Sequence, residues 1–253
     1  MSYRLKKEFI FGFHAINTLL KSQPERISKL FQQAGREDKR IQEMMQLAED
    51  QHIPVQSVSK SQCDEWSKGG VHQGVLAEIK IARALSERDL WILLNQRMEN
   101  VSRPPFLLIL DGVQDPHNLG ACLRSANAAG VDAVIIPEDR SASMTPIVRK
   151  VAAGAAEMTP LIAVTNLATT LEKLKKAGVW CHGLDQSGTQ LIYDTILTGA
   201  LALVLGAEGK GLRRLTKERC DALIAIPMAG SVSSLNVSVA AGICLFEALR
   251  QRQ

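Results

Sequence analysis

The second part of the chain alternates strand-length apolar runs with helical patterns, and this alternation restricts the possible folds most strongly. Phe106–Leu110 and Ala200–Leu205 are continuously apolar, and shorter apolar runs recur between segments whose apolar residues have helical spacing. Strands that are apolar along their whole length are buried on both faces. The pattern therefore predicts an α/β domain with a parallel sheet covered by helices on both sides.

The first part of the chain predicts a smaller α/β unit. Lys39–Gln51 has apolar residues at helical spacing, and strands are expected at Ile27–Gln32, Pro54–Val58 and Val75–Ile81. The next stretch is charged around a helical Leu90–Leu94 core, so we expect a linker that contains a helix. The predicted organisation is a domain at 1–81, a linker at 82–104 and a domain at 105–253.

Composition and charge exclude several classes of protein. The chain has 253 residues, 46% of them hydrophobic, and a formal net charge of +4, which permits nucleic-acid binding without establishing it. The five cysteines are scattered without a CxxC, so we expect free thiols in a reducing cytosol and no metal site. The N-terminal residues lack the pattern of a signal peptide, and no apolar run has membrane-spanning length. We therefore expect a cytoplasmic protein without a membrane partner.

Three polar loops follow expected strands and could form one site. They begin at Asp111, Gly206 and Pro227. The carboxyl ends of parallel strands meet at one edge of a sheet, where ligands of α/β proteins bind. The sequence therefore predicts that these loops lie together.

The loop Gly206–Gly211, GAEGKG, indicates contact between backbone and a ligand, or tight packing. It matches neither the Walker loop nor the dinucleotide-binding GxGxxG pattern. Glu208 stands among glycines, where a mere surface charge is hard to explain. The basic residues that follow, Lys210 and Arg213 among them, suit phosphate contacts or a solvated helical face.

Each of the other two loops leaves alternatives open. Asn118 could cap a helix or belong to a site, and Arg124 could be a site residue or a solvated surface arginine. Ser234 is a plausible N-cap of the final helix. The serines around it do not indicate a hydrolase, because no GxSxG elbow or complete triad is present.

Taken together, the three loops resemble the motifs of the SpoU (TrmH-type) RNA 2′-O-ribose methyltransferases. The matching segments are NLGACLRSA at Asn118–Ala126, LVLGAEGKGL at Leu203–Leu212 and IPMAGSVSSLNVSVAAGICLFE at Ile226–Glu247. The segments FGFHAINTLL, GREDKR and VHQGVLAEI resemble the N-terminal part of family members that act on 23S rRNA. The resemblance implies a SPOUT fold whose C-terminal segment forms a deep trefoil knot. It also implies an N-terminal RNA-binding domain that resembles a small ribosomal protein.

The resemblance implies an activity as well: methyl transfer from S-adenosylmethionine (SAM) to the ribose 2′-OH of a guanosine in 23S rRNA, without a metal. The residues that it places against SAM are Leu205, Gly206, Ala207, Ile226, Met228 and Leu235. The polar catalytic group would be Asn118, Arg124, Glu208, Ser234 and Asn236. Candidate RNA contacts are Arg36, Lys39, Arg40, Lys210 and Arg213. A tRNA ribose methyltransferase of the same family and a non-catalytic ribosome-assembly factor remain alternatives.

The role of Arg124 and the oligomeric state are further expectations. A guanidinium group is effectively always charged, so we expect Arg124 to anchor the target phosphate rather than to act as a general base. The resemblance implies a homodimer through the C-terminal domain. The final helix offers an apolar stripe for it, or for packing on its own sheet, at Val239, Ile243, Phe246 and Leu249.

Overall fold

The computed structural model describes residues 8–36, 38–79, 85–100 and 102–253. The chain divides into two compact units, Met1–Arg83 and Ala84–Gln253. The end of the strand expected at Val75–Ile81 and the first residues of the expected linker lie outside the described residues.

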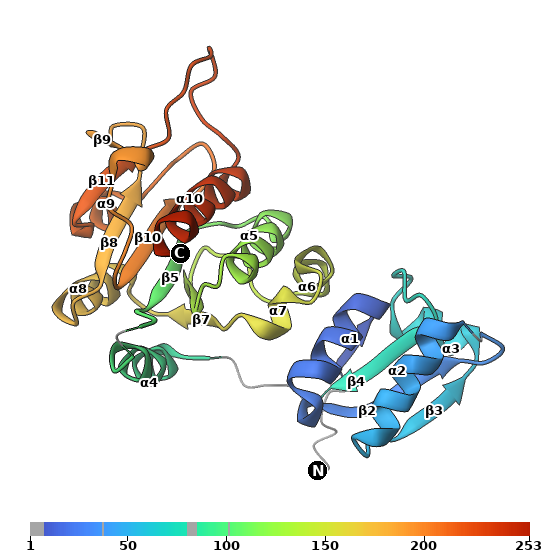
Figure 1. The fold of residues 1–253 in the computed structure, drawn as a ribbon. Helices are drawn as coiled ribbons and strands as arrows, with labels where there is room; N and C mark the ends of the chain where they lie inside the picture. The colour runs from blue at the N-terminus through green and yellow to red at the C-terminus, as the bar shows by residue number, and fades with distance from the viewer. Residues whose placement is uncertain (1–7, 37, 80–84, 101) are drawn as a thin grey trace, which may run out of the picture. The chain divides into compact units, whose positions relative to one another are not determined.

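The first unit is a four-stranded sheet with the order β1-β4-β2-β3 (Figure 1). Strand β4 runs antiparallel to both β1 and β2, whereas β3 runs parallel to β2. The elements are β1 (Glu8–Phe11), α1 (Phe13–Ser22), β2 (Ile27–Gln33), α2 (Lys39–Asp50), β3 (Val55–Val58), α3 (Lys60–Trp66) and β4 (Val75–Ile79), with a 3-10 turn at Pro24–Arg26.

The sheet of this first unit is covered on both faces. Helices α1 and α2 contribute Ile16, Leu19 and Met44 to a core on one face. On the other face Phe31 packs in a smaller cluster with Trp66 of α3, with the ring centroids 4.8 Å apart. The amphipathic spacing of α2 thus has its apolar side against the sheet.

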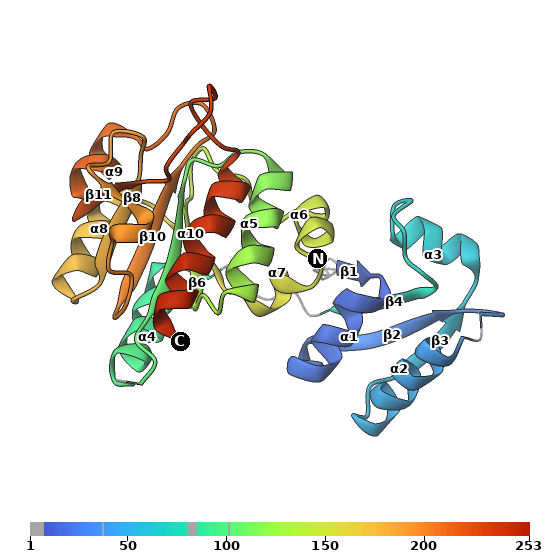
Figure 2. The ribbon, with the colours of Figure 1, turned by 45° about the horizontal axis from the view of Figure 1, so that its top comes forward.

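The second unit is a seven-stranded sheet with the order β7-β6-β5-β10-β8-β11-β9, and every pair of neighbouring strands is parallel (Figure 1 and Figure 2). The prediction of a parallel sheet is therefore confirmed. Its strands are β5 (Phe106–Asp111), β6 (Ala133–Pro137), β7 (Leu161–Val164), β8 (Trp180–Leu184), β9 (Gln190–Leu191), β10 (Leu201–Gly206) and β11 (Ala222–Ala225). Its helices are α4 (Glu87–Met98), α5 (Pro116–Ala128), α6 (Pro146–Ala152), α7 (Ala155–Met158), α8 (Leu167–Lys176), α9 (Arg214–Arg219) and α10 (Val237–Arg252), with a 3-10 turn at Ile192–Asp194.

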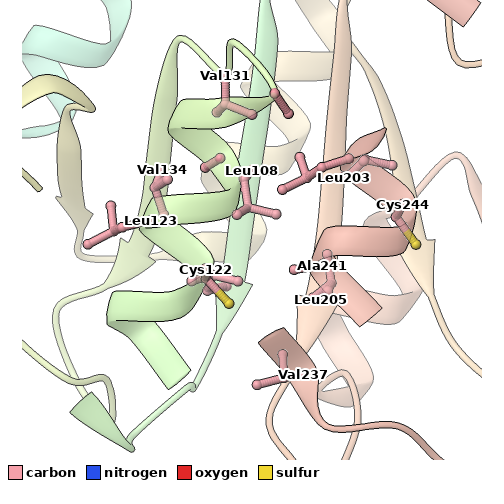
Figure 3. Packing of buried hydrophobic residues seen from close by; sticks show 14 of the residues in the cluster. Leu108, Cys122, Leu123, Val131, Val134, Leu203, Leu205, Val237, Ala241 and Cys244 are labelled. Atoms are coloured by element: carbon pink, nitrogen blue, oxygen red, sulfur yellow. The ribbon is translucent and has the colours of Figure 1, made fainter. Parts of the chain in front are cut away.

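One face of this sheet packs against α5 and α10. Leu108 and Leu203 from neighbouring strands meet Cys122 of α5 and Ala241 of α10 in one buried cluster (Figure 3). Helix α5 also lies close to α6, because a Cβ on Gly120 would come within 2.7 Å of the Val151 Cβ. The absent side chain at Gly120 therefore allows this helix contact.

The opposite face packs against α4 and α8, and α9 lies beside α8. Leu90 and Leu94 of α4 are buried in the same cluster as Leu107 and Ile109 of the sheet. The helix that was expected within the 82–104 linker is thus built into the core of the second unit. A charged sequence around a few leucines gave no sign of this packing, since surface helices have the same composition.

Two helices begin at residues other than those expected. The side chain of Asp115 caps α5 by accepting from the His117 amide at 2.9 Å, so Asn118 is not its N-cap. The side chain of Asn236 caps α10 by accepting from the Ser238 amide, so the expectation for Ser234 was wrong. Either position offers a good capping side chain, and the local sequence does not rank them.

The five cysteines are free thiols. Burial raises the pKa of Cys122 and of Cys244 to about 12, so these thiols are unreactive. No group of three potential metal ligands occurs among the residues that the structure describes. Within the same residues, no helix has both the length and the apolar character needed to cross a membrane.

Candidate functional site

The carboxyl ends of β5 and β10 lie side by side at one edge of the large sheet. The two strands are paired in parallel register up to Asp111 and Gly206, their last residues. The loop that leads from β5 to α5 and the glycine-rich loop after β10 therefore start next to each other. This is the arrangement expected from the order of strands and loops in the sequence.

The glycine-rich loop folds back tightly on its own first residue. A Cβ added to Gly206 would lie 2.0 Å from the carbonyl carbon of Gly211 and 2.3 Å from the Leu212 amide nitrogen. Gly211 itself has a φ of +65°, in the left-handed region that favours glycine. Glycines at both ends are thus required by the path of the backbone.

A cavity of about 480 Å³ lies between this loop and the segment that joins β11 to α10. That segment projects from the unit beyond the sheet (Figure 1). All six residues expected to contact SAM line the cavity: Leu205, Gly206, Ala207, Ile226, Met228 and Leu235. Its volume is within the range of small-molecule sites, roughly 300–1,000 Å³. The wall combines apolar side chains such as Leu205 and Ile226 with polar ones such as Ser234, which suits an adenosyl or methionyl group.

Other lining residues were missed by the sequence analysis. Asp185 and Gln186 follow strand β8, and the amide of Gln186 donates to the Ser233 carbonyl, linking this loop to the projecting segment. The remaining lining residues that had not been singled out are Leu184, Ile224, Ser233, Val237 and Ala240, whereas Gly209 and Gly211 belong to the loop for which ligand contact or tight packing was expected. The rule that ligands bind at strand carboxyl ends could have singled out Asp185 and Gln186.

The carboxylate of Asp185 is held by a lysine and a serine. Partial burial raises its pKa, but hydrogen bonds from Ser187 and Lys217 outweigh this effect, so the pKa lies below its ordinary value. The Lys217 Nζ is 2.9 Å from Asp185 Oδ1. The cavity wall therefore contains an ionised but paired carboxylate.

A chain of polar side chains runs beside the cavity and joins all three loops. The Asn236 amide donates to Asn118 Oδ1 at 3.0 Å, and the Asn118 amide donates to Glu208 Oε2 at 3.3 Å. The backbone amide and hydroxyl of Ser238 both donate to Asn236 Oδ1. Asn118 is 8% exposed, whereas Glu208 is exposed and also lines the cavity. The structure thus brings together three of the five residues expected in the catalytic group.

The other two expected catalytic residues lie outside this chain of hydrogen bonds. Ser234 lines the cavity and is exposed. Arg124 is exposed on α5, and its guanidinium forms no hydrogen bond or ion pair within the described part of the chain. Asn118 and Glu208 are hydrogen-bonded to each other and not to Arg124.

The candidate RNA contacts are divided between the two units. In the first unit, Arg36 Nε lies 3.6 Å from Asp38 Oδ2. Lys39 and Arg40 are exposed in the first turn of α2. In the second unit, Lys210 lines the cavity and is exposed. Arg213 differs, because its guanidinium binds the carboxylate of Asp111.

Comparison with known protein families identifies both parts of the chain. Residues 105–246 match the SpoU rRNA Methylase family, and residues 9–85 match the family described as RNA 2′-O ribose methyltransferase substrate binding. The chain belongs to the SpoU rRNA methylase family.

Individual relatives narrow the comparison further. The chain is 52% identical over 246 residues to the 23S rRNA (guanosine-2′-O-)-methyltransferase RlmB of Pseudomonas putida, covering 97% of each chain. It is 54% identical over 245 residues to RlmB of Escherichia coli, covering 97% of this chain and 99% of that protein. The fold is also similar to the crystal structure of the SpoU methyltransferase AviRb from Streptomyces viridochromogenes in complex with AdoMet. That comparison has a TM-score of 0.76 at 23% identity and covers 97% of this chain and 90% of the other.

Proposed function

We propose that this chain transfers a methyl group from SAM to the ribose 2′-OH of a guanosine in 23S rRNA. The observation that carries the proposal is a cavity formed by two loops at the sheet edge, with Asn118, Glu208 and Asn236 hydrogen-bonded beside it. The proposal is further supported by the full-length similarity to proteins named as 23S rRNA (guanosine-2′-O-)-methyltransferases.

The cavity wall fits the cofactor in its chemistry as well as in its size. Leu205, Ile226 and Leu235 would offer apolar contact, and Gly206 and Ala207 would offer backbone groups to polar parts of the ligand. Met228 would complete the pocket. The bound SAM supplies a methyl group on a positively charged sulfur, ready for in-line attack.

The residues beside the cavity would hold the ribose oxygen and the neighbouring phosphate. Asn236 and Asn118 orient the carboxylate of Glu208, while Ser234 offers a hydroxyl at the cavity wall. Arg124 has donors free to grip a phosphate, and a guanidinium keeps its charge throughout the physiological pH range.

We also propose the deep trefoil knot of the SPOUT fold for the second unit. The chain leaves β11, which lies beyond β8, and returns to α10, which packs on α5 and on the β10 side of the sheet. The segment between them lines the same cavity as the glycine-rich loop. This path supports threading of the C-terminal segment.

A homodimer through the second unit is part of the same proposal. On α10 Val239 and Phe246 are each 50% exposed, and Ile243 between them is half-buried. The face that packs on the sheet has other residues, among them Ala241, Cys244 and Leu245. An apolar stripe that its own sheet leaves uncovered favours a second copy of this chain.

The first unit would select the RNA. Lys39 and Arg40 begin α2 next to Arg36, and such a cluster can grip phosphates. We propose that residues 1–81 and 105–253 carry the two functions, with α4 of the segment between them packed on the second unit. We also propose a cytoplasmic location in which rRNA is accessible.

Labelled SAM tests the proposed function. The protein is incubated with unmodified 23S rRNA or with unmodified tRNA, and the methylated riboses are mapped. We expect label on the 2′-oxygen of a guanosine in 23S rRNA. Label on tRNA would support a tRNA methyltransferase instead, and RNA binding without any transfer would support a non-catalytic assembly factor.

A further inference from the structure

Asp111 places a carboxylate in the interior at the end of β5. Its side chain has an exposed fraction of 0%. Its Oδ2 accepts from the Arg213 backbone amide at 3.0 Å, and its Oδ1 accepts from Nε and Nη2 of the same arginine at 2.5 Å each. A buried carboxylate is stable when it is hydrogen-bonded to an opposite charge, so the two residues hold each other in place.

This ion pair links the end of the glycine-rich loop to the start of the loop between β5 and α5. Asp111 pairs in the sheet with Gly206, where the glycine-rich loop begins, and Arg213 immediately precedes α9, two residues after that loop ends. Asp111 also starts the segment that leads to Asn118, whose amide donates to Glu208 in the middle of the glycine-rich loop. The two loops are thus joined twice, once by a buried charge pair and once by a hydrogen bond.

We propose that Asp111 and Arg213 are a positioning pair for methyl transfer. The pair fixes the backbone of the glycine-rich loop against the cofactor and keeps Glu208 within reach of Asn118. The inference rests on the proposed function and assigns to Arg213 a role other than a phosphate contact. The planar fork of Arg213 uses Nε and Nη2 for the carboxylate, whereas Lys210 in the same loop is exposed and available to RNA.

The test compares Arg213→Lys and Asp111→Asn with the matched control Arg214→Lys. Arg214 is the next residue, 79% exposed at its side chain, and pairs with Glu218 on its own helix. For each full-length variant, calorimetry gives SAM affinity and the number of sites, steady-state transfer gives kcat and KM, and RNA binding is measured over a salt series. Wild-type protein that fails to bind SAM would reject the proposed function itself.

We expect Arg213→Lys and Asp111→Asn to weaken SAM affinity and to raise the KM for SAM by about tenfold or more, the loss typical of a hydrogen bond to a charged group. The salt slope of RNA binding should stay at the wild-type value, and Arg214→Lys should resemble wild type in every measurement. A smaller number of SAM-binding sites with unchanged SAM affinity would show that the pair only stabilises the fold, and would overturn the proposal. Normal SAM affinity with a lower salt slope would show a phosphate contact and overturn it as well.

If neither variant folds, hydrogen exchange of the wild-type protein tests whether the Asp111–Arg213 pair is coupled to the cofactor site. The Arg213 amide donates to Asp111, so saturating SAM should slow its exchange if the pair and the cofactor site are coupled. Unchanged exchange at Arg213, in a protein that binds SAM, would contradict the proposal.

Discussion

The cavity and the polar side chains beside it lie at the same sheet edge but are built in different ways. The cavity wall includes the glycine-rich loop, whose backbone closes tightly on Gly206, together with apolar and polar residues after β8 and β11. The neighbouring cluster depends on the side-chain amides and carboxylate of Asn118, Glu208 and Asn236. A wall made of close backbone contacts does not accommodate added atoms, whereas a hydrogen-bonded cluster is sensitive to the loss of a single donor. Substitutions should therefore separate cofactor binding from methyl transfer.

Among these substitutions, Gly206→Ala is expected to have the largest effect, because it changes the wall of the cavity. Its Cβ would lie 2.0 Å from the Gly211 carbonyl carbon, so the loop must move or the strand must distort. We expect a destabilisation of at least about 3 kcal/mol, the upper range for overpacking, and no SAM binding. Thermal unfolding and calorimetry measure both. Gly230→Ala is the control, because a Cβ there meets no atom within 4 Å, and wild-type SAM affinity in Gly206→Ala would contradict the account.

Arg124→Lys should come next and should act on transfer. Lysine keeps the charge but lacks the planar two-donor fork, so we expect single-turnover transfer to fall about 100-fold with SAM affinity nearly intact. The measurement uses saturating RNA and SAM over a pH series. Rates close to wild type would refute a bidentate grip on phosphate. A rate that rises with pH in Arg124→Ala, but not in wild type, would favour proton transfer by Arg124 instead.

Asn236→Asp tests the hydrogen-bonded cluster without changing its size. Aspartate keeps the oxygen that caps α10 but loses the amide that donates to Asn118. We expect kcat to fall about tenfold while thermal stability stays close to wild type. Asn236→Ala should lose activity to a similar degree and also about 1 kcal/mol of stability, because the cap is removed. Equal kcat in Asn236→Asp and wild type would exclude the cluster from the reaction.

The double substitution Lys39→Glu with Arg40→Glu should weaken RNA binding. It should leave the cavity and the polar cluster at the sheet edge unaffected. Each lost phosphate contact should reduce the salt slope by about one. The matched control reverses Lys21 and Lys60, which are also exposed in the first unit and change the net charge equally. Equal RNA affinity in the two variants would move the RNA surface elsewhere, and SAM affinity should be unchanged in both.

Glu247→Gln should have the smallest effect and act on stability alone. Hydrogen bonds from Arg250 and then Gln251 lower the pKa of Glu247 from 4.5 to about 2. Because the folded-state pKa is lowered, this stabilisation is complete above pH 4.5 and is lost as the pH falls towards 2. The melting temperatures of wild type and Glu247→Gln should differ at neutral pH and converge in acid. A difference that does not change with pH would exclude the ionised carboxylate as its cause.

The parallel sheet and the meeting of the three loops could be predicted because the information is local. Apolar strands such as Phe106–Leu110 and the glycines of Gly206–Gly211 each indicate their own environment. Strand β9 was not expected, since two exposed residues carry no periodicity.

Long-range polar contacts could not be predicted in the same way. Asp111 and Arg213 are 102 positions apart, so nothing near either residue indicates their pairing. The sequence left two roles possible for Asn118, helix cap and site residue, because both use the same side-chain amide group. Its contacts with Glu208 and Asn236 show which role it has. The packing of α4 on the sheet was likewise decided by partners distant in the sequence.

Hydrogen exchange of the full-length protein with and without SAM measures whether the loops around the cavity bind the cofactor. We expect SAM to slow exchange of backbone amides in residues 206–211 and 226–235, two of the segments that line the cavity. Amides of α2 in the first unit should exchange at unchanged rates. Exchange that SAM leaves unaltered in both loops, or slows in the first unit instead, would contradict the account.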